Sequence, residues 1–299
     1  MVVGRFAPSP SGRMHLGNVF SAMLAWLSVR SAGGRMLLRI EDLDPDRCRP
    51  EYADQLRRDL EWLGLDWDEE QTPQSRRTEA YAEAFSRLDT YPCYCSRNEL
   101  HAASAPHASD GTFVYAGTCR ALTDAERAAK TRRPAWRVRV PDAEISFVDG
   151  LQGEVREDLA RECGDFILRR SDGVYAYQLA VVVDDAAGGV TEIVRGADLL
   201  RSTPRQLWLQ TQLGYPHPEY YHVPLLCAAD GRRLSKRDGD LDLGALRRTH
   251  TPEQLLGKLA YLAGLLEAPE AASAAELARE FDWSRIITKN ILINSVFFH

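Results

Sequence analysis

The chain has 299 residues, of which 44% are hydrophobic and 27% are charged, and its net charge is -6. This length accommodates an α/β core with one or two smaller modules. The acidic balance argues against a protein that coats nucleic acid nonspecifically, because such proteins usually need a broad basic surface. No apolar run approaches the roughly 20 residues that span a bilayer, and the N-terminus lacks a signal-peptide core. We therefore expect a cytoplasmic protein without membrane contact.

The first third of the chain alternates between predicted strands and helices. Val2–Phe6 is a short β-like run, Pro8–Gly12 breaks regular structure, and residues 15–30 place apolar side chains at helical spacing. The apolar run Met36–Ile40 predicts a buried second strand, and Pro50–Leu63 has helical periodicity. This βαβα opening predicts an α/β fold with a Rossmann-type, doubly wound parallel sheet, whose sites lie at the carboxyl ends of the strands.

Residues 91–141 have a different composition, richer in Ser, Ala, His, Gly and Thr, and we interpret them as an insertion. The α/β pattern then resumes, with a central strand predicted at Ala180–Val183 and another strand at Thr191–Arg195. A helix is expected after Pro204.

The C-terminal part is predicted to be helical over Glu253–Leu265 and Ala271–Phe281. Residues 286–299 change to an Ile, Asn and Phe vocabulary, which is compatible with a docking strand or with a foreign tail. We expect a catalytic domain over residues 1–228 and a loop and helical region over 229–299.

A first motif, "RFAPSPSGRMHLGN", covers Arg5–Asn18. Its small residues let backbone amides approach a ligand, while His15 and Asn18 open a helix whose N-terminus is an anion site. Phosphate suits such a site. For the His-x-Gly segment taken alone, a helix cap with a packing histidine is the simpler interpretation.

A second motif, "GRRLSKRDG", covers Gly231–Gly239. Its Lys236 is one of only four lysines among the 37 Lys and Arg residues. A Gly-flanked loop with Lys and Ser can fold over a triphosphate and offset the charge that develops as pyrophosphate leaves. Without the first motif, an ordinary solvated turn is the simpler interpretation.

Three cysteines, Cys93, Cys95 and Cys119, are grouped like metal ligands but are one short of a closed tetrahedral site. Residue chemistry alone would add His101 or His107 as the fourth ligand. The alternative is reduced cysteines without a metal, and the lack of an export signal argues against disulfides.

Together the two motifs resemble the ATP signatures of class I aminoacyl-tRNA synthetases, the first as a histidine-glycine motif and the second as a Lys-Met-Ser-Lys-Ser loop. The resemblance to glutamyl-type synthetases continues through four further blocks in family order. These blocks are "RIEDLDPDR" at Arg39–Arg47, "DFILRRSDG" at Asp165–Gly173, "YQLAVVVDD" at Tyr177–Asp185 and "EIVRGADLL" at Glu192–Leu200.

The resemblance implies roles for individual residues. It implies ATP binding by Pro8, His15, Gly17, Asn18, Arg233, Leu234, Ser235, Lys236 and Arg237, with His15 and Lys236 as catalytic residues. It implies L-glutamate binding by Arg5, Phe6, Ala7, Pro8, Ser9, Glu41, Tyr177 and Arg195. The two arginines would bind carboxylates, Glu41 would accept the ammonium, and Mg²⁺ would accompany ATP.

The resemblance also implies one structural zinc per chain. Relatives use a tyrosine four residues before the last cysteine, and Tyr115 stands at that place in "YAGTC". The implied ligands are Cys93, Cys95, Tyr115 and Cys119.

Three features favour the short paralogues, the glutamyl-Q tRNA(Asp) synthetases. The chain ends soon after the lysine loop, leaving no room for an anticodon-binding domain, Val181 replaces the usual Asn, and Ser11 replaces the common Thr. The resemblance implies formation of glutamyl-adenylate and transfer of glutamate to the queuosine base of tRNA(Asp). We expect a monomer.

Other functions compete with this interpretation. A truncated glutamyl-tRNA synthetase would charge tRNA(Glu). A small-molecule nucleotidyltransferase or ligase shares both ATP motifs, but the Cys-x-Cys insertion and the glutamyl-type blocks argue against it. A non-catalytic RNA-binding relative would lack His15, Lys236 or Arg5, and all three are present.

Overall fold

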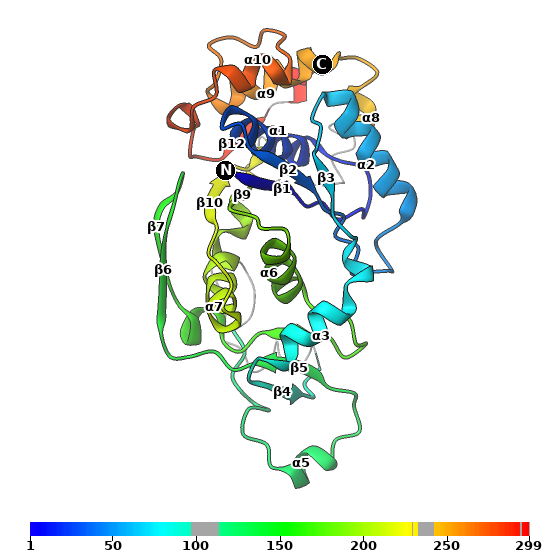
Figure 1. Cartoon of the computed structure of the whole chain (residues 1–299), viewed down its shortest axis with the longest axis vertical. Coiled ribbons are helices and arrows are strands. Elements are labelled where there is room, and N and C mark those ends of the chain that lie inside the picture. The colour runs from blue at the N-terminus through cyan, green and yellow to red at the C-terminus, as the bar shows by residue number, and fades with distance from the viewer. Residues whose placement is uncertain (97–113, 229, 233–241, 294, 299) are drawn as a thin grey trace.

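The computed structural model describes residues 1–96, 114–228, 230–232, 242–293 and 295–298. An α/β core occupies the centre, with the C-terminal helices at one end and a small antiparallel sheet at the other (Figure 1). None of the described helices is long and apolar enough to cross a membrane.

Five parallel strands form the centre of the core. They are β1 (Val3–Phe6), β2 (Arg35–Leu38), β3 (Glu69–Glu70), β9 (Glu192–Gly196) and β10 (Glu219–Val223). The backbone N–H of Thr191 donates to the carbonyl oxygen of Val3 at 2.9 Å, which places β9 beside β1. The three-stranded sheet β1-β2-β3 and the two-stranded sheet β9-β10 thus lie side by side in the spatial order β3-β2-β1-β9-β10. The chain extends the sheet on one side of β1 first and on the other side from β9 onward, so the strand order reverses between β1 and β9. The predicted Rossmann-type fold class is confirmed.

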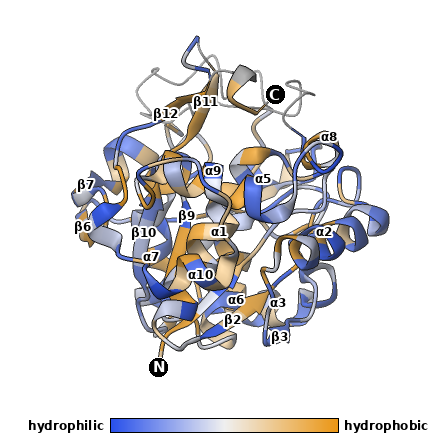
Figure 2. Ribbon diagram, turned by 90° about the horizontal axis from the view of Figure 1, so that it is seen from above, coloured by the Kyte–Doolittle hydropathy of each residue, from blue (hydrophilic) through white to orange (hydrophobic). Residues whose placement is uncertain are grey.

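Helices surround this sheet. They are α1 (Leu16–Ser31), α2 (Pro50–Leu63), α3 (Thr78–Ser86), α6 (Tyr177–Ala187), α7 (Thr203–Leu213), α8 (Leu243–Leu246), α9 (Pro252–Ala263) and α10 (Ala274–Arg279). Hydrophobic residues concentrate in β9 and α1, whereas α2 and the outlying segments are more hydrophilic (Figure 2). The helices predicted from the two C-terminal apolar patterns are present as α9 and α10, with α10 shorter than expected.

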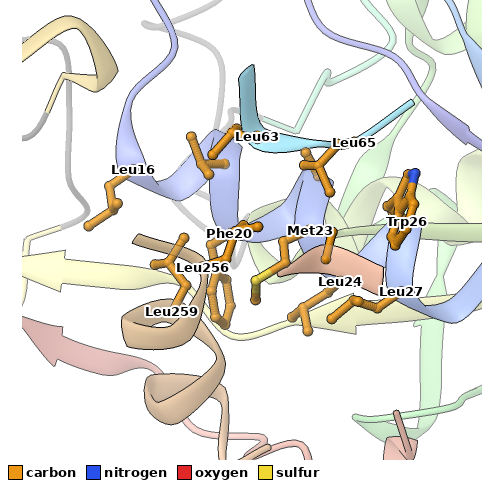
Figure 3. Packing of buried hydrophobic residues seen from close by; sticks show 14 of the residues in the cluster. Leu16, Phe20, Met23, Leu24, Trp26, Leu27, Leu63, Leu65, Leu256 and Leu259 are labelled. Carbon is orange, nitrogen blue, oxygen red and sulfur yellow. The ribbon is translucent and has the colours of Figure 1, made fainter. Parts of the chain in front are cut away.

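The largest hydrophobic core joins the two ends of the chain. Phe20 and Met23 of α1 are almost completely buried and lie near Leu256 and Leu259 of α9 (Figure 3). Burying one such side chain stabilises the fold by about 1.5–3 kcal/mol. The C-terminal helices therefore pack directly on α1, the helix that begins at the end of the first motif.

The central strand predicted at Ala180–Val183 is wrong, because these residues lie in α6. Helix α6 packs against both α3 and α7, and every residue from Leu179 to Asp185 is buried. A helix that is covered on all sides needs no polar face, so its short apolar run has the same pattern as a buried strand.

The predicted insertion contains a small antiparallel sheet. β4 (Thr90–Cys93) pairs with β5 (Ala135–Val138), and β5 pairs in turn with β8 (Ile167–Arg169). Helix α5 (Asp124–Ala128) lies beyond this sheet, at the extreme end of the molecule (Figure 1). The sheet thus takes its third strand from beyond residue 141.

A hairpin that the sequence did not reveal follows the insertion. Its strands, β6 (Glu144–Asp149) and β7 (Gly153–Asp158), pair along their full length and lie along one side of the core (Figure 1). The backbone N–H of Gly150, at its turn, donates to the carbonyl oxygen of Tyr220 at 2.8 Å. The hairpin turn is therefore attached to β10.

The C-terminal tail forms a docking strand. β12 (Ile291–Ile293) pairs in parallel with β11 (Leu226–Ala228), and Ile291 lies opposite Leu226. The short helical turns of the described chain are Gln74–Arg76, Leu159–Cys163, Ala197–Ser202, Trp283–Arg285 and Ser295–Phe298. This pairing is the arrangement that a docking strand would adopt.

Candidate functional site

A cavity of about 450 Å³ lies at the carboxyl ends of β1 and β9, where the strand order reverses. Eleven of the residues predicted to bind ATP or glutamate line it together. They are Arg5, Phe6, Ala7, Pro8, Ser9, His15, Gly17, Asn18, Glu41, Tyr177 and Arg195. The structure brings these residues to one place, and their individual roles stay predictions.

Two buried guanidinium groups form one end of the cavity. Arg5 and Arg195 are each only 5% exposed. Arg5 donates through Nε to Asp185 at 3.3 Å, and Arg195 donates through Nη2 to the hydroxyl of Thr203 at 2.8 Å and through Nη1 to that of Tyr177 at 3.4 Å. Because hydrogen bonds to neighbouring residues hold both guanidinium groups, this end of the cavity is suited to binding carboxylates.

Arg39 adds a third guanidinium group behind this end of the cavity and was not among the predicted site residues. It is fully buried and contacts Asp185 at 2.7 Å and Glu41 at 3.1 Å. Burial raises the pKa of Glu41 above its ordinary value, although Arg39 and Arg5 oppose that shift. Burial alone would also raise the pKa of Asp185, but Arg39 and Arg5 outweigh it and hold this pKa below the ordinary value.

His222 stands directly behind Arg195, and sequence reasoning missed it. Its Nε2 accepts from Nε of Arg195 at 3.0 Å, so its Nδ1 carries the proton and donates to Asp149 at 2.6 Å. Burial and the charge of Arg195 lower the pKa of His222 to about 4, although Asp149 opposes the shift. The imidazole is therefore neutral near pH 7. A histidine within the strand sequence "EYYHV" was the only signal for it.

The other end of the cavity is the N-terminus of α1. His15 is its N-cap: its Nδ1 accepts from the N–H of Gly17 at 3.1 Å, while the side chain of Asn18 accepts from the N–H of His15 at 3.3 Å. The two interpretations of the first motif, a helix cap and a phosphate site, are therefore compatible, because a capped helix N-terminus remains an anion site.

The described flanks of the second motif both reach this end. Leu226 of β11 lines the cavity, and Asp242 forms an isolated β-bridge with His15. The N–H of Leu243 donates to the carbonyl oxygen of Met14 at 3.0 Å. The predicted ATP-binding residues between these flanks lie outside the described residues. They are Arg233, Leu234, Ser235, Lys236 and Arg237.

The cysteine cluster lies in the insertion, next to β4. The Sγ atoms of Cys93, Cys95 and Cys119 all lie within 4.8 Å of one another. The hydroxyl oxygen of Tyr115 is 3.5 Å from Sγ of Cys93 and 4.0 Å from Sγ of Cys95. Ligands 2.3 Å from a tetrahedral metal lie about 3.8 Å apart, so the three thiols could hold a metal ion.

Tyr115, the fourth ligand that the family resemblance implies, lies beside the three thiols. Tyr115 is buried, and its hydroxyl accepts from the N–H of Cys119 at 2.7 Å. His101 and His107, the alternatives that residue chemistry favoured, lie outside the described residues.

Known proteins resemble this chain over almost all of its length. Residues 1–296 match the family described as tRNA synthetases class I (E and Q), catalytic domain. A glutamyl-Q tRNA(Asp) synthetase from Nitratidesulfovibrio vulgaris is 53% identical, with 89% of this chain and 87% of the relative covered. A glutamyl-Q tRNA(Asp) synthetase from Symbiobacterium thermophilum is 50% identical, with 96% of this chain and 94% of the relative covered.

A solved structure also matches the described fold. The glutamate tRNA ligase from Elizabethkingia meningosepticum, in complex with its amino acid, superposes with a TM-score of 0.84 at 26% identity. The superposition covers 99% of this chain and 68% of the ligase. The chain belongs to the class I aminoacyl-tRNA synthetases of the glutamyl and glutaminyl type, in the branch of the glutamyl-Q tRNA(Asp) synthetases.

Proposed function

We propose that this enzyme, an ATP-dependent ligase, activates L-glutamate to glutamyl-adenylate and transfers the glutamyl group to the queuosine base of tRNA(Asp). The names of its relatives support the acceptor. The observation that supports this chemistry is that two buried arginines, Glu41 and the N-terminus of the 16-residue helix α1 line the same cavity.

The charge of the first end of the cavity suits glutamate. Three guanidinium groups outnumber the two carboxylates closest to them there, so the cluster favours a ligand with a net negative charge. These groups are Arg5, Arg39, Arg195, Glu41 and Asp185. Free glutamate carries one net negative charge, so the pairing is complementary. Each charged hydrogen bond contributes about 1.5–3 kcal/mol, and Tyr177, Ala7 and Ser9 complete the wall.

The second end suits the nucleotide. The N-terminus of α1 and His15 would bind phosphate oxygens, with Pro8, Gly17 and Asn18 shaping the approach. The α-carboxylate of glutamate attacks the α-phosphorus, a carboxylate–phosphorus bond forms, and pyrophosphate leaves with the bonding electrons. Mg²⁺ bound with ATP would screen the phosphate charge.

The second motif would complete this end from its two anchored flanks. Lys236 would neutralise the departing pyrophosphate, assisted by Arg233, while Leu234, Ser235 and Arg237 would shape the loop. Because the flanks contact the cavity, a loop between them needs no long reach to cover the phosphates.

We further propose one structural zinc held by Cys93, Cys95, Tyr115 and Cys119. The converging thiols and the buried hydroxyl support this set. The metal would fix the shape of residues 91–141, the acceptor-binding insertion of the 1–228 catalytic domain, with 229–299 contributing the ATP loop and a helical stem-contact region. We propose that the enzyme works as a monomer in the cytoplasm.

Two assays test the function. Glutamate-dependent exchange between ATP and pyrophosphate should proceed without tRNA, because the glutamate and ATP residues belong to one chain. Glutamylation should then require tRNA(Asp) that contains queuosine, with queuosine-lacking tRNA(Asp) and tRNA(Glu) as controls. Exchange that depends on tRNA(Glu), with glutamate attached to that tRNA, would instead establish a truncated glutamyl-tRNA synthetase.

A further inference from the structure

The turn of the β6–β7 hairpin holds His222 through both its side chain and its backbone. One carboxylate oxygen of Asp149 accepts from the backbone N–H of His222 at 3.2 Å, and the other accepts from Nδ1 at 2.6 Å. Nε2 of Gln152 donates to the carbonyl oxygen of His222 at 2.8 Å. All three polar groups of His222 that face the hairpin are therefore engaged by one turn.

The turn is itself tightly packed on β10. Asp149 also accepts from the N–H groups of Leu151 and Gln152, at 3.0 and 2.9 Å. A Cβ atom on Gly150 would lie 2.1 Å from the ring of Tyr221, which only a glycine avoids. The carboxylate that orients His222 is thus fixed within a turn that has little room to move.

His222 connects the hairpin turn to the substrate cavity through its contact with Arg195. It is 0% exposed and cannot touch a ligand itself, whereas Arg195 lines the cavity. With Nδ1–H committed to Asp149, Nε2 presents its lone pair to Nε of Arg195 at 3.0 Å. Thr203 and Tyr177 fix two other nitrogens of the same guanidinium. The imidazole thereby adds a third hydrogen bond to a guanidinium that two hydroxyls hold and that lies 5.3 Å from the ring centre of Tyr220, and this bond helps to set its rotation. Its Nε2 also lies 3.2 Å from the hydroxyl of Thr203.

We infer that Asp149 and His222 are positioning residues that hold Arg195 in the orientation that binds a substrate carboxylate. This inference rests on the proposed glutamate site and adds the hairpin to it. Fixing the guanidinium before the substrate arrives lowers the ordering cost of binding, so glutamate affinity depends on a residue that glutamate never contacts.

Two substitutions of His222 distinguish a role in orienting Arg195 from a role in stabilising the fold alone. In His222→Asn the side-chain amide nitrogen lies near the place of Nδ1, so the hydrogen bond to Asp149 is kept and the acceptor for Arg195 is lost. In His222→Gln the amide oxygen reaches the place of Nε2 and can accept from Arg195, but the buried Asp149 loses its partner. His222→Asn should therefore be the more stable variant, and His222→Gln should bind glutamate better.

The measurements are the glutamate dissociation constant by calorimetry and the thermal midpoint of each variant. We expect His222→Asn to weaken glutamate binding by about 10- to 100-fold, with His222→Gln closer to the parent protein. His217→Asn, an exposed histidine that is hydrogen-bonded to Thr211, is the matched control and should change neither quantity. If glutamate affinity instead follows thermal stability, with Gln worse than Asn in both, the inference is overturned.

Glutamate-dependent exchange by the parent protein is measured separately. Glutamate binding with the expected Asn and Gln order but without exchange would refute the proposed adenylation and leave the positioning role intact. Normal exchange with the reverse order of affinities would refute the positioning role alone.

Discussion

Replacing Asp185 with Asn should destabilise the protein strongly, because this carboxylate lies between two buried guanidinium groups. Asp185 is 3% exposed and contacts Arg39 at 2.7 Å and Arg5 at 3.3 Å. Asn keeps the size and one oxygen acceptor but removes the charge. Breaking a buried ion pair by removing one partner typically costs about 3–5 kcal/mol, because the other charge stays buried.

For a chain of this size that loss corresponds to a fall in the thermal midpoint of about 5–8 °C. Calorimetry of the parent protein and of Asp185→Asn at pH 7 measures it. The exposed carboxylate of Asp46 supplies the control, and Asp46→Asn should change the midpoint by less than about 2 °C. Equal midpoints for all three proteins would refute the idea that Asp185 stabilises this cluster.

The pH dependence provides a second check with a fixed sign. Burial acts to raise the pKa of Asp185, but Arg39 and Arg5 lower it below its ordinary value. A lowered carboxylate pKa contributes stability that is fully present above the unfolded pKa, near 4, and is lost as pH falls through the folded pKa. The difference between the parent protein and Asp185→Asn should therefore be constant from pH 8 to 5 and shrink below about pH 4. A difference that grows on acidification would contradict this assignment.

Further predictions concern Lys236 at the proposed nucleotide site and the proposed zinc ligands of the insertion. Lys236→Ala should lower the exchange rate by about 10²–10³-fold with little change in glutamate affinity, and a loss of affinity at unchanged turnover would contradict a role at the departing pyrophosphate. Elemental analysis should find about one zinc per chain, and Cys93→Ser should lose it, impair RNA glutamylation and retain some exchange; metal-free protein purified from zinc-replete cells without chelator would refute the site. Tyr115→Phe should weaken zinc retention without abolishing it, since three thiolates remain, and unchanged retention would exclude the phenol as a ligand.

The sequence predicted those features that depend on local pattern. The strand, loop and helix of residues 2–31 follow from one apolar run, turn-forming residues and helical spacing, and the structure contains them as β1 and α1. The parallel sheet followed from the repetition of that unit. The position of the candidate cavity was also predictable, because sites in a parallel sheet lie at the carboxyl ends of its strands, while the family resemblance implied which residues bind there.

Tertiary packing decided what local pattern leaves ambiguous. Ala180–Val183 has the composition of a buried strand, yet it forms a helix because α3 and α7 cover both of its sides. The last strand, β12, pairs with β11, whose residues lie 65 positions earlier in the chain, so its own local pattern could not predict its partner.

The buried polar contacts that hold the cavity residues could likewise not be predicted from the sequence. Asp149 and His222 are 73 residues apart, and Arg39 meets Asp185 across the sheet, so no spacing rule connects them. Each of these polar groups is buried, and a buried charge or imidazole needs a partner that only the folded chain can supply. The sequence thus determined which side chains line the cavity, and the tertiary structure decided which buried partners hold them in position.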